Sequence, residues 1–299
     1  MVETIDIKGV PHAVELTAPQ TFPDVLVFIH GWLLSRAYWK PIVQNLSSDY
    51  QCLSYDLRGF GHSQIPPSLS SHSNGDRPSG HVEWLGAFQH TPAAYADDLI
   101  QLLDCLNISS AWLVGHSLGG SIALWASDRC PERIKGVICV NSGGGIYLKE
   151  EFERFRAAGE QLVRLRPRWL CQLPLLDLIM TRMNVARPIA RQWGRQRLVD
   201  LVLAHPEAAL GALLDSTTEH EVHRLPQVVS RIKQPVYFIA GANDDIMEPQ
   251  YVHHLASFHP SFQCTGENVT ELPNCGHLAM IEQPELLTRH IRQTLQHHA

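Results

Sequence analysis

Residues 113–120 read Leu-Val-Gly-His-Ser-Leu-Gly-Gly, so Ser117 stands in a Gly-x-Ser-x-Gly pattern between Gly115 and Gly119. A strand-like apolar run precedes the serine, and an apolar helical pattern follows it. A serine is a weak nucleophile unless a base takes its proton. A sharp strand-to-helix turn lifts its hydroxyl clear of the backbone, and glycine fits the crowded positions on either side. The pattern predicts a nucleophilic Ser117, with the Leu118 amide at the helix N-terminus meeting a developing oxyanion.

The elements that must position this serine alternate between strand and helix patterns. Helical patterns occur at 93–106 and 118–126, and alternation at 4–7 and 12–16 predicts an N-terminal antiparallel hairpin. Short and nearly continuous apolar runs, typical of strands buried on both faces, lie at 25–29, 52–55, 111–114, 137–140 and 236–240. This order predicts an α/β fold with a doubly wound, mostly parallel central sheet, in which ligands bind at the C-terminal ends of the strands.

Two stretches interrupt the alternation. Residues 64–92 are rich in Ser, Pro, Gly and His and predict a long loop, with Trp84 and Phe88 bordering the entrance to the site. Residues 145–225 are helical in pattern and predict an inserted helical cap. The predicted core then consists of residues 1–144 and 226–299.

Composition bounds the possible partners and compartment. The chain has 299 residues and a net charge of −6, which argues against general nucleic-acid binding. No apolar run approaches the roughly 20 residues of a transmembrane segment, and the N-terminus lacks the pattern of a secretory signal. The seven cysteines are scattered without a CxxC pair, which predicts reduced thiols in a cytoplasmic protein and no metal site.

Five motifs resemble the α/β-hydrolase superfamily, in its order and over essentially the whole chain. They are His30-Gly31-Trp32, the segment 56–63 (Asp-Leu-Arg-Gly-Phe-Gly-His-Ser), the Gly115–Gly119 turn, the segment 241–244 (Gly-Ala-Asn-Asp) and Cys275-Gly276-His277. The resemblance is to serine hydrolases with a helical cap, of the esterase, carbon–carbon hydrolase and haloperoxidase-like branch. It implies a catalytic triad in the chain order Ser, Asp, His.

The resemblance assigns the remaining roles. His277 is the general base and Asp244 the acid that orients it, with the neighbouring Asp245 as the alternative. The backbone amide of Trp32 joins that of Leu118 in an oxyanion hole, and Gly31 permits the close approach of the backbone. In the segment 56–63, Arg58 is expected to pair structurally, and Gly59 and Gly61 to let the turn pass close to the serine.

The type of nucleophile separates the reaction classes. Related dehalogenases and epoxide hydrolases carry an aspartate where this chain has Ser117, so acyl transfer is expected here. We expect cleavage of an apolar carboxylic ester through an acyl-enzyme, without a metal or organic cofactor. The alternatives are a carbon–carbon or lactone hydrolase with the same triad, and a ligand receptor with slow turnover on the same fold.

The predicted cap is unusually basic. Residues 151–200 contain ten arginines and five acids, about +5 in a chain of net −6. Apolar residues are interleaved with the arginines. A solvated helical face over an apolar underside is the simplest interpretation. The alternatives are peripheral contact with an anionic membrane surface and steering of an anionic substrate.

Overall fold

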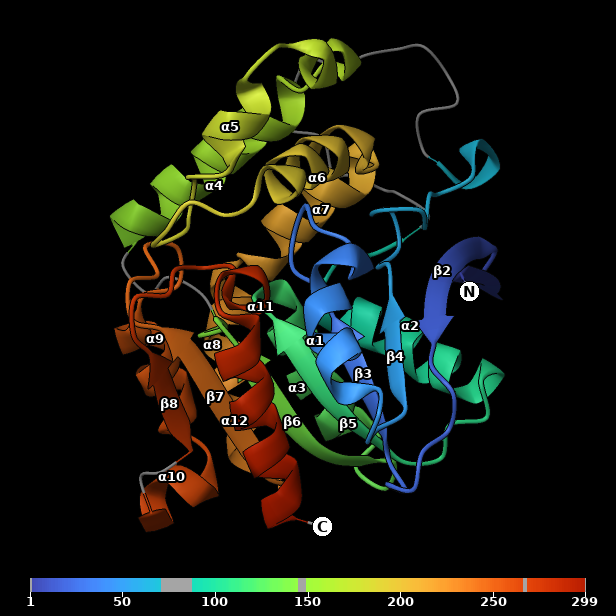
Figure 1. Ribbon diagram of the computed structural model, residues 1–299, viewed down its shortest axis with the longest axis vertical. Helices are drawn as coiled ribbons and strands as arrows, with labels where there is room; N and C mark the ends of the chain where they lie inside the picture. The colour runs from blue at the N-terminus through green and yellow to red at the C-terminus, as the bar shows by residue number, and fades with distance from the viewer. Residues whose placement is uncertain (1, 71–87, 145–148, 266–267, 299) are drawn as a thin grey trace.

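The computed structural model describes residues 2–70, 88–144, 149–265 and 268–298. An eight-stranded sheet runs through the molecule in the order β1-β2-β4-β3-β5-β6-β7-β8 (Figure 1). Its strands are β1 (Val2–Ile7), β2 (Val10–Leu16), β3 (Val25–Ile29), β4 (Cys52–Tyr55), β5 (Ala111–His116), β6 (Ile134–Val140), β7 (Val236–Gly241) and β8 (Val269–Leu272). The hairpin β1–β2 is antiparallel and joins β4 antiparallel, whereas all pairs from β4 to β8 are parallel. The predicted fold class is confirmed.

Side chains of successive strand residues enter two separate cores. In β3, Val25, Val27 and Ile29 belong to one buried cluster, and Leu26 and Phe28 belong to the other. Both faces of the strand are therefore apolar, which explains why the sequence shows continuous rather than alternating runs.

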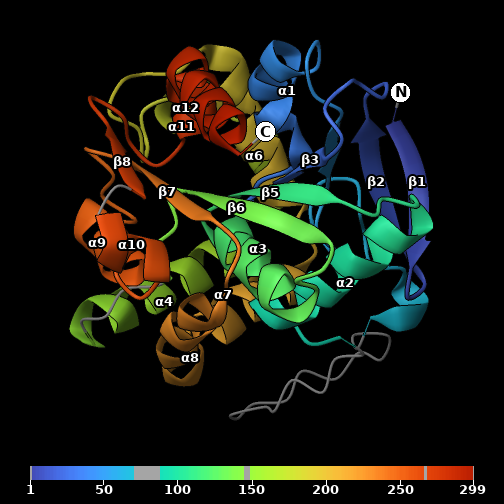
Figure 2. The same cartoon turned by 90° about the horizontal axis from the view of Figure 1, so that it is seen from below.

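Helices cover both faces of the sheet (Figure 2). One face carries α1 (Lys40–Leu46), α11 (Ala279–Glu282) and α12 (Pro284–His297). The other carries α2 (Pro92–Cys105), α3 (Leu118–Arg129) and α8 (Glu219–Arg231), with α9 (Pro249–Ala256) and α10 (Pro260–Thr265) near its β8 edge. Helix α2 begins one residue before its predicted start because the Thr91 side chain accepts a hydrogen bond from the Ala94 amide and caps it.

The chain between β6 and β7 forms a second, helical layer. We call α4 (Lys149–Arg164), the 3₁₀ helix η3 (Arg168–Gln172), α5 (Leu176–Met180), α6 (Arg191–Leu203) and α7 (Pro206–Ser216) the upper helices. They lie beyond the C-terminal ends of the parallel strands (Figure 1). The next helix, α8, packs on α3 against the sheet, so the expected boundary at 225/226 falls inside a helix. The division into core and cap stays a prediction.

The predicted long loop is described only at its ends. Residues 67–69 form the 3₁₀ helix η2 (Pro67–Leu69), and Trp84 lies outside the described residues. Phe88 packs against the core, with the guanidinium carbon of Arg58 4.4 Å from its ring centre.

Candidate active site

The serine of the Gly-x-Ser-x-Gly pattern lies on the turn from β5 to α3. Its backbone has φ 52° and ψ −118°, a conformation that costs a non-glycine residue on the order of 1–3 kcal/mol. Hydrogen bonds with the end of β6 and with the residues after it help to hold this backbone. The Ser117 amide donates to the Val140 carbonyl at 3.0 Å, and the Ser142 hydroxyl donates to the Ser117 carbonyl at 2.8 Å. Strain of this kind is typical of a functional residue that its surroundings fix in place.

The two flanking glycines are required by close packing of backbone on backbone. A Cβ atom at Gly115 would lie 2.2 Å from the Gly119 carbonyl oxygen. A Cβ atom at Gly119 would lie 2.3 Å from the carbonyl oxygen of Ile29, at the end of β3. The turn therefore packs directly against the neighbouring strand β3.

His277 and Asp244 form a buried pair. His277 Nδ1 lies 2.8 Å from Asp244 Oδ2, and the two residues are 9% and 3% exposed. The other oxygen, Oδ1, accepts from the amides of Ile246 and Met247, each at 2.9 Å. Asp245 is exposed, so Asp244 is the carboxylate that holds the imidazole.

The environment of Asp244 keeps it ionised. Burial by itself would raise the pKa of Asp244. The charge of His277, its hydrogen bond and the two backbone amides outweigh burial, so the pKa of Asp244 is lowered. An ionised Asp244 accepts the hydrogen bond from Nδ1–H of His277, and Nε2 is then the ring nitrogen that can accept a proton.

A buried histidine joins His277 to the serine turn. Nε2 of His116, the residue before Ser117, donates to the His277 carbonyl at 2.7 Å, and the two rings are 4.8 Å apart. Burial and the nearby His277 lower the pKa of His116 to about 3, so it acts as a neutral donor. The His277 amide donates to Asn184 in the connection between α5 and α6. His277 is thus fixed from both sides.

Two residues after β6 complete the arrangement and were missed in the sequence. Asn141 Nδ2 donates to Asp244 Oδ2 at 2.8 Å and to the Gly276 carbonyl at 3.1 Å. Ser142 supports the Ser117 carbonyl. Their only sequence signal is polarity directly after a strand of the same parallel set, where C-terminal strand ends gather.

The loop after β3 brings the expected oxyanion residues to the same edge. Buried His30 donates from Nδ1 to the Gly31 carbonyl at 2.8 Å and accepts at Nε2 from the Leu57 amide at 2.9 Å. A Cβ atom at Gly31 would lie 2.7 Å from His116 Nδ1. The Trp32 indole donates to the Ala209 carbonyl in α7, at 2.7 Å. His30 thereby fixes the segment whose Trp32 amide was assigned to the oxyanion.

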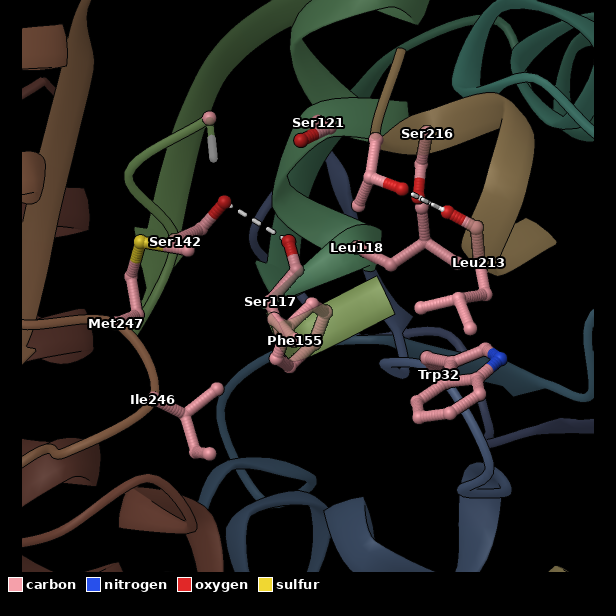
Figure 3. Close-up of a pocket in the computed structure, with 12 residues that line it drawn as sticks. Trp32, Ser117, Leu118, Ser121, Ser142, Phe155, Leu213, Ser216, Ile246 and Met247 are labelled. Atoms are coloured by element: carbon pink, nitrogen blue, oxygen red, sulfur yellow. Dashed lines mark hydrogen bonds between the residues drawn. The ribbon is translucent and has the colours of Figure 1, made fainter. Parts of the chain in front are cut away.

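A pocket of about 90 Å³ opens at Ser117 (Figure 3). Figure 3 shows Ser117 between Met247 and Ile246 on one side and Trp32 and Leu213 on the other. Half of the residues that line the pocket are apolar: Trp32, Leu118, Phe155, Leu213, Ile246 and Met247. Besides Ser117, four further lining residues carry hydroxyl groups: Ser121, Ser142, Ser216 and Thr217. The described pocket suits an apolar group of modest size with polar atoms at one end.

The segment 56–63 has a structural role. Arg58 pairs with Asp98 at 2.8 Å, as expected. The atoms nearest to its glycines belong to α7 and to Asp56, not to the serine turn, so the expected closeness to the serine stays a prediction. A Cβ atom at Gly59 would lie 2.1 Å from Cβ of Ala208 in α7, and one at Gly61 would meet the Asp56 carboxylate at 2.4 Å. Gly59 thus allows α7 to pack closely on the segment, and Gly61 allows the Asp56 carboxylate to lie against the turn.

Neither a metal site nor a membrane span is found in the described ranges. They contain no cluster of three His, Cys, Asp or Glu side chains that could hold a metal ion. None of the helices described is long and apolar enough to cross a bilayer.

Comparison with known proteins extends the resemblance. The chain is 27% identical over 255 residues to a pimeloyl-[acyl-carrier protein] methyl ester esterase of Aliivibrio salmonicida, covering 84% of this chain and 87% of that protein. It is 23% identical over 284 residues to 3-oxoadipate enol-lactonase 1 of Acinetobacter baylyi, covering 93% and 90%.

Solved structures agree in fold. A thermophilic esterase from Thermogutta terrifontis matches with a TM-score of 0.71 at 23% identity, covering 99% of this chain and 98% of that one. A bromoperoxidase from Bacillus anthracis matches with a TM-score of 0.76 at 18% identity, covering 99% and 100%. Identities this low show the fold alone. A family model described as "alpha/beta hydrolase fold" matches residues 24–284, nearly the whole chain. The chain therefore belongs to the alpha/beta hydrolase family.

Proposed function

We propose that this protein is a serine hydrolase that cleaves an apolar carboxylic ester through an acyl-enzyme intermediate. One observation carries the proposal. The hydrogen-bonded Asp244–His277 pair lies beside a strained serine turn, with an apolar pocket opening at Ser117. A nucleophile, a base and a group that orients the base are the parts that acyl transfer needs.

In the proposed first half-reaction, Ser117 Oγ attacks the ester carbonyl carbon while His277 Nε2 takes the hydroxyl proton. Asp244 holds Nδ1 at 2.8 Å, fixes the tautomer and stabilises the imidazolium. The tetrahedral intermediate collapses as the C–O bond to the alcohol breaks, and His277 returns the proton to the leaving oxygen. In the second half, water attacks the acyl-enzyme with the same proton transfers and releases the acid and free Ser117.

The oxyanion is assigned to two backbone amides. Leu118 is the first residue of α3, where helix amides have no partner within the helix. Trp32 stands in the loop that His30 and the indole bond to α7 hold. Losing one such donor typically costs about 2.7–4 kcal/mol of transition-state stabilisation.

The pocket favours a short acyl group. Its volume of about 90 Å³ is small against the roughly 300–1,000 Å³ of sites for drug-sized ligands. We therefore expect an ester with an apolar acyl part of only a few carbons in this pocket.

A lactone is the second candidate, because one relative at 23% identity is named as an enol-lactonase. A lactone is an internal ester, and the same residues would open its ring. Another relative, 26% identical over 339 aligned positions, is named an epoxide hydrolase. Related epoxide hydrolases use an aspartate where this chain has Ser117, which disfavours that chemistry here.

The experiment is hydrolysis of p-nitrophenyl esters from two to sixteen acyl carbons, by the wild type and by Ser117→Ala. We expect wild-type turnover with its optimum at short chains, and no turnover above background by the variant. A wild type inert on all esters but active on lactones would replace the ester assignment. Saturable ligand binding without turnover of either class would favour a receptor.

A further inference from the structure

Exposed large apolar side chains are concentrated in one part of the described surface. Nine of the eleven lie on or between the upper helices: Leu162, Leu165, Trp169, Leu173, Leu175, Leu178, Ile179, Met183 and Leu203. Leu165, Trp169 and Ile179 are 73%, 56% and 59% exposed. The remaining two, Val2 and Phe258, are far apart in the sequence and single. Exposed apolar residues gathered in this way mark a surface that meets something other than water.

The nine residues belong to the outer layer of the molecule. Helix α5 and η3 pack on α6, and α4 packs on α7. In Figure 1, α5 and the C-terminal half of α4 lie farther from the sheet than α6 and α7. The nine apolar side chains stay exposed although the elements that carry them pack on α6 and α7.

Arginine dominates the charge of this surface, although Glu160 of α4 pairs with Arg164. The exposed arginines between 161 and 199 are Arg164, Arg168, Arg182, Arg187, Arg191 and Arg195. The one acid in this range is Asp177, which is buried and paired with Arg191 at 2.6 Å. Exposed acids are therefore absent from this fully described range. Arg168, Arg182 and Arg187 have no carboxylate within 4.0 Å among the described residues.

We propose that this surface docks on an anionic lipid bilayer. Leucine, isoleucine and tryptophan side chains enter the interface between headgroups and acyl chains, and arginine side chains bind lipid phosphates beside them. A symmetric contact with a second copy would bring arginines against arginines. A surface that contacts only water is not expected to expose nine large apolar side chains.

Docking would place the pocket close to the lipid. Helix α4 carries Phe155, which lines the pocket at Ser117, and Leu162 near its C-terminal end; Leu165 follows directly after the helix. Along α4, Leu162 lies seven residues after Phe155, about 10 Å at 1.5 Å per residue. Binding to lipid is nevertheless independent of the reaction at Ser117, so it is tested without activity.

The test is co-sedimentation of the full chain with vesicles of phosphatidylcholine alone or with 30% phosphatidylglycerol. We expect binding to the anionic vesicles that weakens as salt rises. A cationic side chain near an anionic surface contributes about 1 kcal/mol, or about fivefold in partitioning. The triple variant Arg168→Gln, Arg182→Gln, Arg187→Gln should therefore bind about 100-fold more weakly.

Matched variants distinguish binding through this surface from binding that depends only on the total charge or hydrophobicity of the protein. Lys40→Gln, Lys233→Gln, Arg289→Gln removes three exposed cations elsewhere and should change binding by less than about threefold. Trp169→Ser, Ile179→Ser should weaken binding by about tenfold or more, and Val2→Ser, Phe258→Ser should not. Circular dichroism and melting confirm that each variant is folded.

Three results would overturn the proposal. They are a wild type that does not sediment with anionic vesicles, surface variants that bind as well as their controls, and a solution dimer that the surface variants dissociate. The last would assign the surface to a second copy of the chain.

Discussion

Asn141 offers a sharp test of how the candidate site is held together. Its amide donates to Asp244 at 2.8 Å and to the Gly276 carbonyl at 3.1 Å, and its φ is 48°. Asn141→Gly keeps this backbone conformation and removes only the side chain. A hydrogen bond to a charged acceptor contributes about 1.5–3 kcal/mol to folding stability, and one to a neutral acceptor contributes about 0.5–1.5 kcal/mol. The loss of both should therefore lower the free energy of unfolding by about 2–4 kcal/mol.

The effect on catalysis should be smaller but distinct. In Asn141→Gly, Asp244 keeps its hydrogen bonds to His277 and to the amides of Ile246 and Met247. We therefore expect kcat to fall about tenfold with KM unchanged, which corresponds to an increase of about 1.4 kcal/mol in the activation free energy. Asn141→Asp has the same size but puts a second carboxylate 2.8 Å from the first. At an effective dielectric constant of 20 that repulsion is about 6 kcal/mol, so one carboxyl must stay protonated. A larger loss of kcat is expected.

The assay combines thermal melting with hydrolysis of a p-nitrophenyl ester well below the melting temperature of each variant. An Asn141→Gly variant that is less stable but turns over at the wild-type rate would reduce Asn141 to a structural role. An Asn141→Asp variant as active as the wild type would show that the hydrogen bond from Asn141 to Asp244 does not support catalysis.

Three further predictions concern packing, charge and pH. Gly119→Ala places a Cβ atom 2.3 Å from the Ile29 carbonyl, so melting should show a loss of about 1–3 kcal/mol. Asp244→Asn cannot accept the Nδ1 proton of His277 in the same way, so kcat should fall up to about 10⁴-fold in ester hydrolysis. Burial raises the pKa of Asp200 from 3.8 to about 7, so the folded state binds more protons than the unfolded state between these values. Folding stability should fall as pH rises through this window, by at most about 4 kcal/mol, and denaturant unfolding of Asp200→Asn should show a smaller decrease.

The sheet was predictable because its strands are buried on both faces. The apolar runs at 25–29 and 52–55 coincide with β3 and β4, and β6 begins three residues before the predicted run. The start of β6 was missed because an exposed lysine, Lys135, and a buried glycine, Gly136, interrupt the apolar pattern. A Cβ atom at Gly136 would lie 2.3 Å from the Trp112 ring, a contact between strands that no local pattern reveals.

The site was predictable only where a motif carries its own geometry. The turn at Ser117 and the pairing of His277 with Asp244 follow from motif and chain order. Asn141 could not be found in this way, because its function depends on β6 and β7 being neighbours and on the distance between their ends. The proximity of segment 56–63 to α7 likewise depends on tertiary packing.

The central claim is that Ser117 is acylated during turnover. The most direct measurement is mass spectrometry of the intact protein and its peptides after reaction with a fluorophosphonate. We expect one covalent adduct per chain, on Ser117, with matching loss of ester hydrolysis and no adduct on Ser117→Ala. An enzyme that hydrolyses esters yet is modified at another residue, or not at all, would contradict it.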